Sequence, residues 1–313
     1  MYKKSSGVSF HKFQADSERH RRWIISVDRK EWSPRANDRL CGKHFLGECG
    51  VRGPSNDVEA RAQGPQAQII NGEDGVPHEF PWLVALQKKN GDGWQQWCGS
   101  SLINNQWVAT AAHCLFDDQD PSSYTIVIGE YNTEKPDPGE RRVTISEIEL
   151  HPDWNPKTIN YDYALVKLET PLDFGGADSD VMPICLPTKD QQFPNLTCVG
   201  SGWGSLVQNG PDSTILQKVD LPTVPHDICK ENYANSNPVI EETMICAGYE
   251  EGGKSMCNGD SGGPLMCPRD DGLYVLAGTV SWTVVCAAQY QPSVFARTST
   301  QVDWIESIAG ETP

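Results

Sequence analysis

The residues around Ser261 are of the types that allow its hydroxyl to act as a nucleophile. It lies in the segment 259–264, which reads GDSGGP. A serine hydroxyl attacks a carbonyl efficiently only when a nearby base takes its proton, and the oxyanion that forms needs fixed N–H donors. Because glycine lacks a Cβ, the chain can turn sharply there and direct the backbone amides of Gly259 and Ser261 at one oxygen. The segment therefore predicts acyl transfer at Ser261, with Gly259 and Ser261 as the oxyanion hole.

Two upstream segments offer the other groups that this chemistry needs. The segment 110–114 reads TAAHC and contains His113, and the segment 160–165 reads NYDYAL and contains Asp162. Asp162 lies in an apolar strand pattern that would bury it, and a buried carboxylate needs a partner, which the ring of His113 can supply. The chain order His, Asp, Ser differs from the orders found in subtilisins and in α/β-hydrolases.

These segments resemble those of the chymotrypsin/trypsin family of serine endopeptidases, over residues 69–310. Further matching segments read IING at 69–72, FPW at 80–82, CGSSLI at 98–103, GSGWG at 200–204 and VSW at 280–282. The resemblance implies that His113 is the general base, that Asp162 orients it and that Ser261 is the nucleophile. It also implies hydrolysis of protein or peptide substrates through an acyl-enzyme. A catalytically silent homologue that acts as a binding cofactor is the alternative.

Short β-prone runs separated by turn signals predict an all-β fold for this region. The runs are 82–86, 107–109, 124–129, 143–150, 164–168, 198–203, 215–221, 244–247, 264–267, 274–282 and 293–297. The resemblance implies two six-stranded Greek-key β-barrels of chymotrypsin type, with the active site between them. The apolar stripe of Val302, Ile305 and Ile308 predicts one C-terminal helix. Thr300 can cap this helix and Gly310 can end it.

The resemblance also implies a zymogen. Cleavage after Gln68 would free the amine of Ile69, which would pair with Asp260 and assemble the oxyanion hole and the substrate pocket. Gln68 departs from the usual Arg or Lys, so a trypsin-like activating protease is not expected. Cleavage after Arg61 would leave seven further residues before Ile69, too many for the amine to be buried.

Primary specificity is implied for the position six residues before the nucleophile, which is Ser255. An Arg or Lys side chain would lose its water there without gaining a counter-charge, so cleavage after basic residues is not expected. Thr283 and Ser293 stand where glycine is common in the family, and both add bulk. The pocket positions together are Ser255, Met256, Ser281, Trp282, Thr283 and Ser293. They predict an elastase-like preference for small or medium apolar residues, with a chymotrypsin-like preference as the alternative.

The 11 cysteines predict a disulfide framework and hence a secreted protein. The resemblance implies the pairs Cys49–Cys185, Cys98–Cys114, Cys198–Cys267, Cys229–Cys246 and Cys257–Cys286, with Cys41 left over. Residues 1–7 lead into no apolar segment of a signal peptide, and no run of about 18 apolar residues predicts a membrane span. The family implies protein or peptide substrates, an activating protease and protein inhibitors as partners, and the lack of such an apolar run predicts no membrane partner.

Residues 1–45 differ from the rest in charge. They contain 11 Lys and Arg against 5 Asp and Glu, which leaves −22 for the remainder of a chain whose net charge is −16. Segments 8–13, 22–23, 29–34 and 40–45 resemble the later part of a THAP zinc finger, a DNA-binding module. Cys41 and His44 match its last two zinc ligands, but the first cysteine pair is absent, and two ligands rarely form a structural zinc site. We therefore expect neither zinc nor nucleic acid to bind.

Two interpretations of residues 1–45 remain open. One is a fusion of DNA-binding and protease modules. The other is a mispredicted gene model that joins an unrelated exon to a secreted protease, which accounts together for the missing signal peptide, the odd thiol and the difference in charge. Residues 46–68 form a linker or activation peptide with turn signals at 53–57 and 64–66, and residues 69–313 form the protease domain.

A loop over residues 130–140 offers oxygen ligands at Glu130, Asn132, Asp137 and Glu140. Prolines and a glycine bend this loop, and hard oxygen ligands on a bent loop suit Ca²⁺. The loop also resembles the calcium loop of the trypsins. Ca²⁺ is therefore a possible ligand, whereas catalysis itself is expected to require no cofactor.

Overall fold

The computed structural model describes residues 49–53, 72–236, 240–310 and 312. The segment 1–45 with Cys41, the linker residues 54–68 and the expected N-terminus Ile69 lie outside these residues. Within the described part, strands outnumber helices by far, and the expectation of an all-β fold with two barrels and a C-terminal helix is confirmed.

The first barrel contains six antiparallel strands in the order β2-β3-β4-β7-β6-β5. Their bounds are β2 (Leu83–Asn90), β3 (Gly93–Leu102), β4 (Trp107–Thr110), β5 (Tyr124–Ile128), β6 (Arg141–Leu150) and β7 (Ala164–Leu168). The sequence of β5, YTIVI, is aromatic and β-branched, which favours extended backbone, and all five of its residues are buried. Pairing of Leu86 in β2 with Ile126 in β5 closes the barrel.

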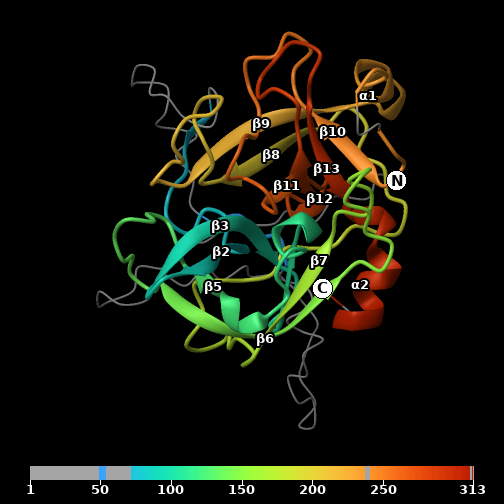
Figure 1. Ribbon diagram of the computed structural model, residues 1–313. Helices are drawn as coiled ribbons and strands as arrows, with labels where there is room; N and C mark the ends of the chain where they lie inside the picture. The colour runs from blue at the N-terminus through green and yellow to red at the C-terminus, as the bar shows by residue number, and fades with distance from the viewer. Residues whose placement is uncertain (1–48, 54–71, 237–239, 311, 313) are drawn as a thin grey trace, which may run out of the picture. The chain divides into compact units, whose positions relative to one another are not determined.

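The second barrel repeats this strand order. Its strands are β8 (Thr197–Gly202), β9 (Gln217–Val224), β10 (Met244–Ala247), β11 (Pro264–Pro268), β12 (Tyr274–Trp282) and β13 (Ser293–Arg297). They follow the order β9-β10-β13-β12-β11-β8, and the pairing of Cys198 with Leu221 joins β8 to β9 and closes the ring. The short strand β1 (Glu73–Asp74) adds to the edge of β9. Figure 1 shows the two groups of strands.

The C-terminal helix, α2 (Val302–Ala309), returns the chain to the first barrel (Figure 1). Ile305 is fully buried in the core of that barrel, and Asn104 donates a hydrogen bond to Ala309 O at 3.2 Å. The expectation that Thr300 caps the helix is wrong. Thr300 ends the preceding 3₁₀ turn, η6 (Thr298–Thr300), and its hydroxyl donates to Arg297 O instead. Gly310 ends the helix with φ 77°, as expected.

A second helix, α1 (His226–Asn232), was not expected from the sequence. It has seven residues, too few to display a clear helical period. The disulfide from Cys229 to Cys246 attaches α1 to β10, and the buried ring of Tyr233 follows directly at its end. Tyr233 stacks edge-on against Trp282 at 4.9 Å, so the end of α1 lies beside the end of β12.

Candidate active site

Strand pairing brings His113 and Asp162 together although 49 residues separate them. The end of β4 lies opposite the start of β7, with Thr110 paired to Ala164. His113 follows Thr110 by three residues, in the 3₁₀ turn η4 (Ala112–Cys114), and Asp162 precedes Ala164 by two. Both side chains therefore lie at the same end of the first barrel.

Three hydrogen bonds converge on the carboxylate of Asp162 at this end of the first barrel. It is 1% exposed and accepts bonds from the His113 backbone N–H at 2.8 Å, from His113 Nδ1 at 2.7 Å and from Ser281 Oγ at 2.5 Å. Since a carboxylate accepts, Nδ1 carries the proton and Nε2 has the free lone pair of a base. Burial lowers the pKa of His113, but the charge and hydrogen bond of Asp162 outweigh burial and raise it above its usual value.

The turn before Asp162 is strained. Ile159 and Tyr161 have φ of 57° and 54°, in the left-handed region, which is unfavourable for a β-branched residue. The ring of Tyr161 stacks on His151 at 4.5 Å, and Tyr163 N donates back to Tyr161 O at 2.7 Å. Such strain persists only where the surroundings determine the conformation, and here it occurs directly before Asp162.

The loop that contains Ser261 lies against strands β3 and β4 of the first barrel. Gly99 N in β3 donates to Ser261 O at 2.8 Å. Gly262 has φ 77°, and a Cβ added to it would lie 2.2 Å from Thr110 Oγ1. Only glycine satisfies both the backbone angle and this close approach. Ser261 is thereby held near the end of β4, close to the turn that contains His113.

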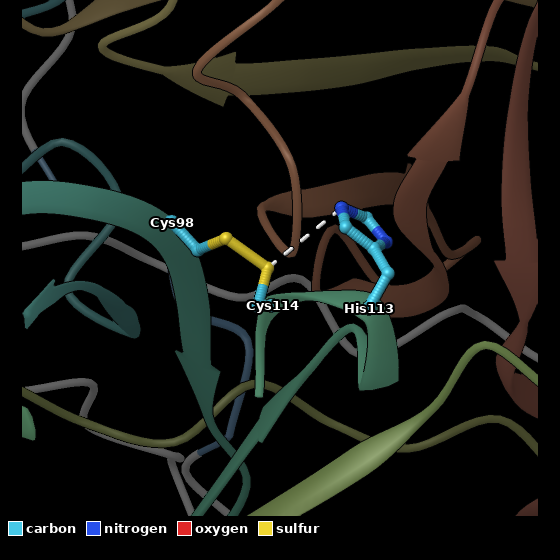
Figure 2. Close-up of side chains that lie close together, drawn as sticks. All are labelled: Cys98, His113 and Cys114. Atoms are coloured by element: carbon cyan, nitrogen blue, oxygen red, sulfur yellow. Dashed lines mark hydrogen bonds between the residues drawn. A yellow bond between two sulfur atoms is a disulfide. The ribbon is translucent and has the colours of Figure 1, made fainter. Parts of the chain in front are cut away.

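No hydrogen bond joins Ser261 Oγ to His113 within the described residues. The contact recorded at His113 Nε2 is with the sulfur of Cys114 at 3.9 Å, which Figure 2 shows as a dashed line beside the Cys98–Cys114 disulfide. Bonds between nucleophile and base are often long without substrate. His113 and the two cysteines do not form a metal site, because the disulfide occupies both sulfurs.

The segment before Ser261 is shaped by a glycine and a buried acid. Gly259 has φ 89°, and a Cβ there would lie 2.7 Å from Asp212 Oδ1. Asp260 is fully buried, and its carboxylate accepts bonds from Gly204 N at 2.8 Å and Cys257 N at 2.9 Å. Burial raises the pKa of Asp260 to about 7. The expected partner of Asp260, the Ile69 amine, lies outside the described residues.

Hydrogen bonds link the expected pocket residues. Ser293 Oγ accepts from Met256 N at 3.2 Å and lies 3.4 Å from Ser255 Oγ, and both serines are buried. The side chain of Met256 packs in the core of the second barrel, because a Cβ on Gly200 would lie 2.3 Å from its sulfur. Of the remaining pocket positions, Ser281 and Trp282 are the last two residues of β12, and Thr283 follows the strand directly.

Five disulfides join the ten described cysteines in the pairs that the sequence resemblance implies. The Cys49–Cys185 bridge joins the segment 49–53 to the segment that precedes β8. The Cys257–Cys286 bridge holds the segment before Gly259 to the loop after β12.

The acidic loop gathers three of its four expected ligands. Carboxylate oxygens of Glu130, Asp137 and Glu140 lie within 4.8 Å of one another. Glu130 is 8% exposed, and its buried Oε1 has no hydrogen-bond partner among the described residues. Burial, with the charges of Glu140 and Asp137, raises the pKa of Glu130 to about 7. The side chain of Asn132 instead accepts a bond from Glu134 N.

Two functional contacts were missed by the sequence analysis. Ser281 was expected only in the pocket, yet it also donates to Asp162. Glu79 is fully buried and bonds Lys218 at 2.7 Å. A charged residue beside Phe80-Pro81-Trp82 reads as an ordinary surface group, so the sequence carries no signal for this burial.

The fold and site define a serine hydrolase of the two-barrel type. The sequence model of the trypsin family matches residues 69–305, and the chain belongs to this family of serine endopeptidases. The THAP domain model matches residues 1–69, which extends the resemblance over the predicted linker.

Relatives support the same assignment. Chymotrypsin-like elastase family member 3B of Macaca mulatta is 39% identical over 250 residues, which cover 77% of this chain and 93% of the relative. Serine proteinase stubble of Drosophila melanogaster is 38% identical over 82% of this chain and 32% of its own length. Transmembrane protease serine 9 of Rattus norvegicus is 34% identical over 79% of this chain and 23% of its own length. The chain thus spans a third or less of the last two. No helix in the described part is long and apolar enough to cross a membrane.

Proposed function

We propose that the protein is a secreted endopeptidase in which Ser261, His113 and Asp162 hydrolyse peptide bonds through an acyl-enzyme. The observation that carries this proposal is the position of Asp162, which is buried and bonds the Nδ1 of His113 at 2.7 Å. This contact fixes the tautomer and the orientation of the ring, and it directs Nε2 away from the carboxylate.

Each group has one role in the reaction. Ser261 Oγ attacks the carbonyl carbon while His113 Nε2 takes its proton, and the amides of Gly259 and Ser261 bind the oxyanion. His113 then gives the proton to the leaving amine, and water repeats the sequence on the acyl-enzyme. The Asp162 carboxylate accepts the bond from Nδ1 and stabilises the imidazolium, in agreement with the raised pKa of His113.

The pocket favours small or medium apolar side chains before the scissile bond. The base is neutral because Ser255 is buried and bonded to the Met256 carbonyl and to Ser293. A buried cation would have no counter-charge there. Thr283 and Ser293 narrow the walls. The printed name of the macaque relative, an elastase, agrees with this preference.

The environment of Asp260 supports activation of the enzyme by a new N-terminus. Its buried carboxylate is met by two backbone amides among the described residues, and a pKa near 7 marks an environment that disfavours the charge. An inserted ammonium would compensate this charge. We therefore assign Ile69 as the N-terminus of the active enzyme and the full chain as a zymogen.

We also propose that Ca²⁺ binds Glu130, Asp137 and Glu140. The donor set is made of carboxylates, which Ca²⁺ prefers, and no described residue forms a hydrogen bond with the buried Glu130 Oε1. The ion would neutralise three neighbouring negative charges on a loop that takes no part in the reaction. It has no role in the chemical step.

A fluorophosphonate probe tests the enzymatic proposal, because it reacts with an activated serine. Activated wild-type protein should be labelled at Ser261 and should hydrolyse a peptide substrate, whereas Ser261→Ala should do neither and should melt at the same temperature. Ser122→Ala changes an exposed serine and serves as the control. Absence of labelling in the activated wild type would instead support the silent homologue that acts as a binding cofactor.

The THAP match favours one second candidate, a DNA-binding segment joined to the protease. Cys49 cannot serve as a zinc ligand in the described fold because it is bonded to Cys185. With Cys41 and His44 as the matching ligands, we propose that the segment holds no structural zinc. Metal analysis of the full chain tests this, and stoichiometric zinc that disappears in Cys41→Ser would favour the fusion.

A further inference from the structure

A single acceptor triplet for N-glycosylation occurs in the sequence. Asn195-Leu196-Thr197 is the only place where Asn is followed by a residue other than Pro and then by Ser or Thr. It lies on the turn that leads into β8, and both Asn195 and Thr197 are exposed. The triplet plays no part in the catalytic site.

The conformation of the turn leaves the Asn195 side chain free. Its φ is 55°, in the left-handed region that asparagine tolerates better than most residues. Leu196 is held on both sides, since Leu196 N donates to Thr223 Oγ1 at 3.1 Å and Thr223 N donates to Leu196 O at 2.8 Å. The Asn195 amide forms no hydrogen bond within the described residues. A substituent on its nitrogen would therefore displace no contact.

The five disulfides indicate the compartment in which the chain folds. Disulfides form in the oxidising lumen of the secretory route, which is also where oligosaccharides are transferred to asparagine. One of them, Cys198–Cys267, begins directly after Thr197. Disulfide formation and glycosylation of the acceptor triplet would thus take place in the same compartment.

We propose that Asn195 carries an N-linked oligosaccharide. In the transfer, Asn195 Nδ2 forms a bond to the anomeric carbon of a lipid-pyrophosphate-linked oligosaccharide. The bond from that carbon to the pyrophosphate oxygen breaks, the lipid pyrophosphate leaves and the amide loses one proton. The amide itself is the nucleophile, and no oxidant or reductant takes part.

The geometry of β8 separates this glycan from the catalytic chemistry. The strand begins at Thr197 and ends at Gly202, and beyond it Gly204 N bonds the Asp260 carboxylate beneath the nucleophile loop. At about 3.3 Å per residue, the strand places its two ends roughly 17 Å apart. The sugar therefore lies at the end of β8 remote from Ser261, and its loss should leave peptide hydrolysis unchanged.

The test uses the full chain, secreted by eukaryotic cells behind a cleavable leader. Peptide N-glycosidase should increase the electrophoretic mobility of the protein and convert Asn195 to Asp in the corresponding tryptic peptide. Asn195→Asp, which tolerates the same φ, and Thr197→Ala should remove the glycan. Thr197→Ser keeps the triplet and should retain it. The readout is mass, so it does not depend on the proposed catalytic activity.

Two results would overturn the proposal. One is wild-type protein that is secreted with its disulfides formed and with Asn195 unmodified. The other is a glycan that persists in Thr197→Ala. A loss of kcat/KM in a folded, unglycosylated Asn195→Asp variant would contradict the placement of the sugar away from the active site.

Discussion

The carboxylate of Glu79 and the ammonium of Lys218 meet at 2.7 Å in a contact that is closed to solvent, although 139 residues separate them. Arg52 Nε donates to the same carboxylate at 3.1 Å, and Val76 N donates to its second oxygen at 3.0 Å. Arg52 lies three residues after Cys49. The network therefore joins the segment 49–53 to β9 of the second barrel, in addition to the Cys49–Cys185 disulfide.

Glu79→Gln should destabilise the fold. It removes the charge shared by Arg52 and Lys218, and breaking a buried ionic network costs about 3 to 5 kcal/mol. Denaturant unfolding measures the change in the free energy of unfolding. Lys189→Gln is the control, because the Lys189–Asp303 pair is exposed and should contribute at most about 1 kcal/mol. Equal effects of both variants would contradict a structural role for the Glu79 network.

Asp162→Asn should lower kcat/KM by several orders of magnitude and move the acid limb of the pH profile to lower pH. In the wild type, Asp162 raises the pKa of His113, and the neutral imidazole is the active base, so activity falls as the pH drops through this pKa. Without the carboxylate charge the pKa falls. The measurement is kcat/KM against pH with an uncharged substrate. Asp180→Asn, an exposed aspartate, should keep the wild-type profile.

The pocket walls should decide substrate size. A fluorogenic library that varies the residue before the scissile bond should show cleavage after Ala, Val, Leu or Met and little after Arg or Lys, because Ser255 offers no charge. Replacing Thr283 and Ser293 by glycine should raise kcat/KM for Phe and Tyr relative to Ala. Ser122→Gly serves as a control outside the pocket. Dominant cleavage of basic residues by the wild type would refute the assignment of Ser255 to the pocket base.

Activation should generate a new N-terminus at Ile69. The Ile69 amine can compensate the buried charge of Asp260, so the full chain should be nearly inactive and the chain that begins at Ile69 active. N-terminal sequencing of the species labelled by a fluorophosphonate checks this. Cys49–Cys185 should keep the preceding segment attached until it is reduced. An active enzyme that retains residues 62–68 on the same chain would contradict the mechanism.

Calcium should raise the Tm of the wild type but not that of Glu130→Gln. Glu134→Gln is the matched control, since Glu134 lies on the same loop outside the carboxylate cluster. The pKa of Glu130 is raised to about 7, which means that the calcium-free fold favours the protonated carboxyl group. The stabilisation by this protonated group is lost as the pH rises through about 7. The effect of calcium should therefore be larger above about pH 7 than below it. An equal effect on all three proteins would exclude this site.

The sequence by itself determined the chemistry and the family. The motifs around His113, Asp162 and Ser261 are short and local, and acyl transfer demands these residue types, so they could be identified without coordinates. The strand runs were also visible because β-branched and aromatic residues cluster in them. The C-terminal helix was predicted from its apolar stripe, although the cap at Thr300 was not, because the preceding 3₁₀ turn engages its hydroxyl.

Tertiary structure alone decided which distant groups meet. Ser281 donates to Asp162 across 119 residues, and Lys218 donates to Glu79 across 139 residues. The two barrels share one strand order although no internal repeat is visible in the sequence. Local patterns specify which face of a strand is buried. Which partners share that interior depends on strand register and barrel closure, and these arise from pairings between segments far apart in the chain.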